Sequence, residues 1–175
     1  EALLALPEGV APQDLLDKAR TEYEKASQIL PTDQYARNRI NEIIKIQVDQ
    51  QVREELYAQA ITKGDQLYNQ KKYQPALTEY KNALKQKPKE KYPQDRVAEL
   101  TELLNQLRIV EESYQNALAA ADQLYGAKRY PEARTGYQDA LKIKPEEQYP
   151  KNRILEIDRI LADQKRLAEE YENYI

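Results

Sequence analysis

Cysteine, histidine, methionine, tryptophan and phenylalanine are all absent from this 175-residue chain. Without histidine and cysteine, the sequence offers no catalytic triad, no imidazole base and no thiol nucleophile. The same absence excludes zinc sites of the usual Cys/His kind and a disulfide framework. Carboxylate pairs are weak evidence for acid–base catalysis among 30 acidic residues. We therefore predict no catalytic residues, no metal site and no cofactor, and we expect that the chain is not an enzyme.

Glycine and long apolar runs are also scarce. The four glycines include no phosphate-cradling loop. The mean hydropathy is -0.92, and no stretch approaches the roughly 18 apolar residues of a membrane helix. The net charge of -3 argues against a nucleic-acid partner, because such a partner usually requires a basic surface. We expect neither membrane insertion nor nucleic-acid binding.

Tyrosine, by contrast, occurs 14 times. One explanation is a tyrosine-rich repeat, in which each favoured position recurs with every copy. The other is a sequence that was engineered or averaged rather than read from one gene. The uneven divergence between copies favours a natural sequence, and both explanations stay open here.

The chain repeats itself with a period of 57 residues. Residues 57–113 and 114–170 are identical at 23 of 57 aligned positions, and a shortened copy precedes them. A fixed period of this length indicates stacked repeats. We predict an all-α solenoid of alternating short and long helices, preceded by an irregular segment at 1–11. The predicted single domain covers 12–175, with units at about 12–56, 57–113 and 114–170, and the start of a further unit at 171–175.

Apolar spacing and proline positions predict the individual helices. A first helix is expected over about 12–30, with one apolar stripe formed by Leu15, Ala19, Tyr23, Ala26 and Leu30. Asp33 can cap the long helix that follows. Short helices are expected at about 74–86 and 131–143, and long ones at 93–127 and 150–174. The helix over 93–127 is predicted to be continuous, with a break near Asn105–Ser113 as the alternative.

Two segments share seven spaced residues of small, large and aromatic type. They are Gly64, Leu67, Tyr73, Ala76, Tyr80, Ala83 and Pro88 in one copy, and Ala121, Leu124, Tyr130, Ala133, Tyr137, Ala140 and Pro145 in the next. This pattern resembles the tetratricopeptide (TPR) signature. Small alanines at these places let two helices approach closely, while leucine and tyrosine fill the space between them.

Each unit is about 23 residues longer than the 34-residue TPR, and the extra residues carry their own pattern. Arginine and glutamate lie three apart on one helix face, so we expect them to pair with each other or with the preceding unit. The three copies are Tyr35, Arg39 and Glu42; Tyr92, Arg96 and Glu99; and Tyr149, Arg153 and Glu156. P-x-E-x-Y-P segments beside TPR-like helices are similar to those of bacterial cell-envelope proteins. This resemblance implies a periplasmic or envelope location.

The TPR resemblance also implies a binding groove on the concave face, lined by the first helix of each pair. Carried over by position, the candidate partner-binding residues are Asp65, Tyr68, Asn69, Asp122 and Tyr125. Two aspartates in such a groove favour a basic peptide or partner helix. The family's basic clamp for carboxylates is not expected, because Ile61 and Asp65 stand where it needs lysine and asparagine. A solvated helix face is the alternative interpretation.

We therefore expect a protein-binding scaffold. The alternatives are a structural spacer or rod within a larger bacterial envelope protein, and an engineered repeat with no natural partner. If Asp65 and Asp122 are surface residues, reversing both charges should abolish binding and leave stability nearly unchanged.

Overall fold

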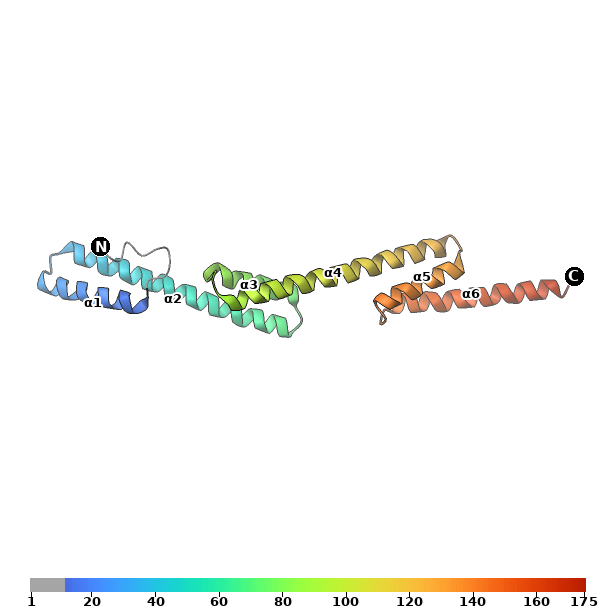
Figure 1. Cartoon of the computed structure of the whole chain (residues 1–175), viewed down its shortest axis with the longest axis horizontal. Coiled ribbons are helices and arrows are strands. Elements are labelled where there is room, and N and C mark those ends of the chain that lie inside the picture. Colours follow the sequence, from blue (N-terminus) through green and yellow to red (C-terminus); the bar gives the residue numbers. More distant parts are fainter. Residues whose placement is uncertain (1–11) are drawn as a thin grey trace. The chain divides into compact units, whose positions relative to one another are not determined.

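The computed structural model describes residues 12–175, and these residues form helices and no strand (Figure 1). Helices account for 87% of the described residues, so the all-α prediction is confirmed. The predicted irregular segment at 1–11 lies outside the described residues. The helices are α1 (Gln13–Ile29), α2 (Gln34–Asn69), α3 (Tyr73–Gln86), α4 (Lys91–Gly126), α5 (Tyr130–Ile143) and α6 (Gln148–Glu172).

The helices form two compact units, and the boundary between them falls within α4. From here on, a unit means one of these two parts and not a 57-residue repeat of the sequence. The first unit ends at Thr101, and the second runs from Glu102 to Ile175. In the first unit, α2 packs against α1 and against α3 (Figure 1). In the second unit, α5 packs against α6 and contributes to a core with α4. Each long helix therefore supplies residues to the packing of a short one.

Local sequence signals explain where the long helices begin. The Asp33 carboxylate caps α2 by accepting a 2.9 Å hydrogen bond from the backbone N–H of Tyr35, as predicted. Pro93 and Pro150 lie in the first turns of α4 and α6, where a missing N–H costs nothing. Helix α4 is continuous over 36 residues, so the alternative break near Asn105–Ser113 is wrong.

A left-handed residue ends both α2 and α4. Lys71 and Lys128 have φ values of 59° and 60°, a conformation that usually belongs to glycine. After α2, the N–H of Lys71 bonds to the Tyr68 carbonyl and that of Lys72 to the Leu67 carbonyl. This is the Schellman arrangement, and the turn after α4 repeats it. Lysine at this position carries a steric cost that glycine would not.

Each unit has a small core of alanine and tyrosine. In the first unit, Ala76, Tyr80 and Ala83 of α3 are fully buried. Their equivalents Ala133, Tyr137 and Ala140 on α5 are fully buried in the second unit. The helix faces predicted from these spacings are confirmed.

The apolar stripe predicted for α1 is confirmed at Ala19 and Tyr23 but is wrong at Leu15, Ala26 and Leu30, which are exposed. Leu16 is fully buried, whereas Leu15 is 43% exposed and Leu30 is also exposed. Leu16, Ala19 and Tyr23 are related by spacings of three and four residues, so Leu16 replaces Leu15 on the buried face. Because Leu15 and Leu16 are adjacent and of the same type, the sequence pattern alone does not indicate which of the two is buried.

The middle of α2 exposes several apolar side chains. These are Ile44, Ile46, Val48, Val52 and Leu56. Apolar spacing on a long helix therefore did not by itself indicate a packing partner. No helix within residues 12–175 is both long enough and apolar enough to span a bilayer.

Candidate functional site: a repeated tyrosine–carboxylate cluster

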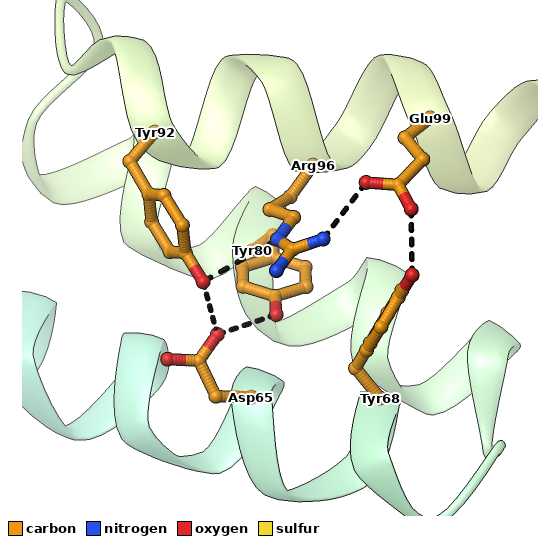
Figure 2. A network of polar contacts seen from close by, with 6 residues as sticks. All are labelled: Asp65, Tyr68, Tyr80, Tyr92, Arg96 and Glu99. Carbon is orange, nitrogen blue, oxygen red and sulfur yellow. Dashed lines mark hydrogen bonds and ion pairs between the residues drawn. The ribbon is translucent and has the colours of Figure 1, made fainter.

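A polar cluster joins three helices of the first unit, and Figure 2 shows its six residues. Asp65 on α2 uses one carboxylate oxygen, Oδ1, to accept hydrogen bonds from Tyr80 of α3 and Tyr92 of α4. Both distances are 2.6 Å. No described residue donates to the other oxygen, Oδ2, which points away from the two rings in Figure 2. We call Asp65, Tyr68, Tyr80, Tyr92, Arg96 and Glu99 the Asp65 cluster.

An ion pair extends the cluster along α4 and back to α2. Arg96 pairs with Glu99 at 2.9 Å, and Glu99 accepts a 2.6 Å hydrogen bond from the Tyr68 hydroxyl. The Arg96 guanidinium lies 4.6 Å from the centre of the Tyr68 ring, within cation–π range. The Arg96–Glu99 pair confirms the prediction that the two residues pair with each other, and the Tyr68 hydroxyl bond to Glu99 lies within the same 57-residue repeat.

The bonds of the cluster shift the pKa values of its members. Burial, followed by the hydrogen bond to Asp65, raises the pKa of Tyr80 far above its usual value. The hydrogen bond to Glu99 raises the pKa of Tyr68. The Tyr68 hydroxyl, with help from Arg96, lowers the pKa of Glu99. The shifts of Tyr68 and Tyr80 strengthen the protonated donor form, and the shift of Glu99 strengthens the ionised acceptor form.

The second unit contains the same cluster 57 residues later. Asp122 Oδ1 accepts hydrogen bonds from the hydroxyls of Tyr137 and Tyr149. The ion pair and the tyrosine–glutamate bond also recur, at 2.9 Å and 2.7 Å. The members of this Asp122 cluster are Asp122, Tyr125, Tyr137, Tyr149, Arg153 and Glu156.

The shortened copy keeps part of the arrangement between α1 and α2. Tyr23 and Tyr35 meet edge to face with ring centres 6.2 Å apart, as Tyr80 and Tyr92 do in the Asp65 cluster. Arg39 lies 5.2 Å from the centre of the Tyr35 ring and pairs with Glu42. The ring and ion-pair contacts are therefore present in all three copies.

A second contact also recurs with the repeat. Lys87 lies 4.8 Å from the ring centre of Tyr57 and pairs with Glu54. In the second unit, Lys144 lies over the Tyr114 ring and pairs with Glu111. Glu111 interrupts the apolar pattern of α4, and its ion pair with Lys144 gives that interruption a structural role.

The predicted site residues fall into both clusters. Asp65 and Tyr68 are half-buried members of the first, while Asn69 is exposed beside them on α2. Asp122 is exposed, and Tyr125 is half-buried in the second cluster. Asp65 and Asp122 belong to different units, so their membership of one connected surface stays a prediction.

The expectation that charge reversal would leave stability unchanged does not fit these bonds. Asp65 and Asp122 each accept a hydrogen bond from a fully buried tyrosine, Tyr80 or Tyr137. A lysine in either place would leave that hydroxyl without its acceptor, at a cost of about 1–3 kcal/mol. Substitutions of Asp65 or Asp122 are therefore expected to lower the stability of the protein as well as to change its surface charge.

The hydroxyls of Tyr92 and Tyr149 are among the members of the site that sequence reasoning missed. Each was recognised as a repeated residue but not as a donor to an aspartate 27 positions earlier. The available signal was the joint identity of Asp65, Tyr80 and Tyr92 with their counterparts in the next copy. Residues that are identical in both copies include the hydrogen-bonded set.

Among residues 12–175, no three His, Cys, Asp or Glu side chains are grouped so as to hold a metal ion. What the clusters can do chemically is join helices and offer Asp65 Oδ2 or Asp122 Oδ2 to an external donor. Comparison with family models, curated proteins and solved structures gives no match to this chain.

Proposed function

We propose that this chain is a TPR-like α-solenoid scaffold that binds a basic peptide or partner helix along a concave face. The partner-binding residues would be Asp65, Tyr68, Asn69, Asp122 and Tyr125. The observation that carries the proposal is the state of the two aspartates. Each carboxylate has one oxygen fixed by two tyrosines and the other without a donor among the described residues.

The charge of the clusters supports a cationic partner. Arg96 is the only cation in the Asp65 cluster, and it pairs with Glu99 rather than with Asp65. One aspartate, one glutamate and one arginine give the cluster a net negative charge. A lysine or arginine from a partner can offset this charge at Asp65 Oδ2, and such a contact weakens as salt concentration rises.

A structural spacer within a larger protein is the second candidate, and a specific observation favours it. Asp65, Tyr68, Asp122 and Tyr125 all form hydrogen bonds inside their own units. Side chains used in this way stabilise helix packing whether or not a partner is present. Under this candidate, no change to Asp Oδ2 alters what the chain binds.

Asparagine substitution separates the two candidates. In a chain carrying both Asp65→Asn and Asp122→Asn, the amide oxygen can still accept from the tyrosines, but the negative charge and the free carboxylate oxygen are removed. We expect the double variant to lose the partners that the parent retains from a bacterial envelope extract at low salt. Asp49→Asn, an exposed position on α2, is the matched control. Equal retention by all three chains would favour the spacer.

A further inference from the structure

The two units differ at one closely packed helix contact. Gly64 of α2 is buried, and a Cβ atom there would lie 2.9 Å from Cε1 of Tyr80. Its equivalent in the second unit is Ala121, and there the glycine is Gly136 of α5. A Cβ atom at Gly136 would lie 3.0 Å from the Ala121 methyl carbon. The glycine at this contact therefore lies on the long helix α2 in the first unit and on the short helix α5 in the second.

Gly136 is also the counterpart of a charged residue in the first unit. Glu79 of α3 occupies that position and pairs with Lys63 of α2 at 2.5 Å, with only 16% of its side chain exposed. The counterpart of Lys63 in the second unit is Ala120, so neither charge of this pair is repeated.

At a second pair of equivalent positions, it is the second unit that has the charged residues. Arg134 of α5 pairs with Asp158 of α6 at 2.7 Å in the second unit. The equivalent positions in the first unit are Leu77, which is 5% exposed, and Thr101. The ion pair of the second unit thus corresponds to a buried leucine and a threonine in the first unit.

We infer that these exchanged positions specify which short helix packs in which unit: α3 against α2 and the first part of α4, and α5 against the last part of α4 and α6. The tyrosine–carboxylate clusters cannot make this distinction, because both units contain the same donors and acceptors. The competitor that must be rejected is the short helix of the other repeat, from the same chain or from a second copy of it. Discrimination then requires contacts that fail when the helices are exchanged.

Placing α3 in the second unit, in place of α5, breaks two contacts at once. Glu79 would stand where Gly136 approaches Ala121, and its Cβ atom would lie about 3.0 Å from the Ala121 methyl carbon, so the two helices would have to shift apart there. Its carboxylate would also face Ala120 in place of Lys63, and a partly buried charge without a partner is unfavourable.

Placing α5 in the first unit, in place of α3, fails for different reasons. Gly136 would lie opposite Gly64, and two missing side chains leave unfilled space at a packed contact. Arg134 would take the buried place of Leu77 with Thr101 in place of Asp158, which leaves its charge unpaired. Both exchanges are therefore unfavourable, each through residues of a different kind.

A substitution series in the full chain tests whether the positions act together. Gly136→Glu should lower the urea midpoint of unfolding, and adding Ala120→Lys and Ala121→Gly should restore at least half of the loss. The pair Ala120→Lys and Ala121→Gly without Gly136→Glu is the control, and should itself lower the midpoint. Additive effects, with no restoration, would overturn the inference.

Refolding tests the pairing itself. A chain in which the second unit receives all the first-unit residues combines Ala120→Lys, Ala121→Gly, Gly136→Glu, Arg134→Leu and Asp158→Thr. We expect this chain to refold from urea into several species, including larger ones that contain exchanged helices, as measured by size-exclusion chromatography with light scattering. The parent should refold into one species. A single parental species from the substituted chain, formed at the parental rate, would contradict the inference.

Discussion

The Asp65 and Asp122 clusters have the same donors and acceptors, but their surroundings differ. Asp65 is half-buried, whereas Asp122 is exposed. Lys63 and Glu79 form an ion pair close to the first cluster in sequence, where the second unit has Ala120 and Gly136. The comparison separates two classes of residue. Those in the clusters are repeated and join the helices of each unit, whereas those that vary between copies make different contacts.

Removing the central tyrosine should have the largest effect, and it should be similar in both units. Tyr80 and Tyr137 are fully buried, so Tyr80→Ala and Tyr137→Ala should each cost about 3–5 kcal/mol in the free energy of unfolding. Urea denaturation measures both. The control is Tyr174→Ala, because that side chain is almost fully exposed and its loss should leave the midpoint unchanged. A small effect at one tyrosine alone would show that the two units are not equivalent in packing.

Removing the aspartate should have a smaller effect that distinguishes the units. Asp65→Ala and Asp122→Ala leave a buried tyrosine hydroxyl without its acceptor, at about 1–3 kcal/mol. The cost should be greater at Asp65, because water reaches the exposed Asp122 site more easily and can replace the lost acceptor. Thermal unfolding of the two variants measures the difference. A greater loss at Asp122 would contradict the assignment of burial to the two sites.

Acid should weaken both clusters through their glutamates. The pKa values of Glu99 and Glu156 are lowered, first by Tyr68 and Tyr125 and then by the neighbouring arginines. A lowered folded-state pKa gives stability that is present above the unfolded pKa of about 4.3 and is lost as pH falls through the folded value. Melting temperatures measured from pH 7 to pH 3 should therefore fall most steeply below about pH 4.3. In Glu99→Gln and Glu156→Gln chains this decline should be shallower, and an unchanged decline would exclude the glutamates as its source.

The turns after α2 and α4 should show the smallest effect. Lys71→Gly and Lys128→Gly relieve a left-handed lysine, and we expect a gain of about 0.5 kcal/mol from each after the entropy cost of glycine. Lys81→Gly is the control, because Lys81 is an exposed residue inside α3 and glycine in a helix interior costs about 0.5–1 kcal/mol. The midpoints of urea denaturation compare the three variants. If Lys71→Gly and Lys81→Gly change stability in the same direction, the left-handed turn is not the cause.

Much of the helical architecture could be predicted because its signals are local. The Asp33 cap, the prolines at Pro93 and Pro150, and the continuity of α4 all follow from neighbouring residues. The choice between Leu15 and Leu16 could not be predicted, because either can join a helical stripe and tertiary packing decides.

The candidate site was predicted only in part, for a different reason. Asp65, Tyr68, Asp122 and Tyr125 were expected in it from the resemblance to TPR repeats. Their internal bonds were not, because Tyr80 and Tyr92 approach Asp65 from 15 and 27 positions away along the chain. Helical periodicity describes one face of one helix and does not report which side chains of three helices converge.

The most direct test of the clusters as the links between short and long helices is a pair of double-mutant cycles. One combines Asp65→Ala with Tyr80→Phe, and the other combines Asp122→Ala with Tyr137→Phe. Each pair of residues shares one hydrogen bond between two helices. We predict a favourable coupling energy of about 0.5–1.5 kcal/mol in both cycles, from urea unfolding of the single and double variants. Additive effects in both cycles would contradict the account, because the two side chains would then stabilise the fold independently.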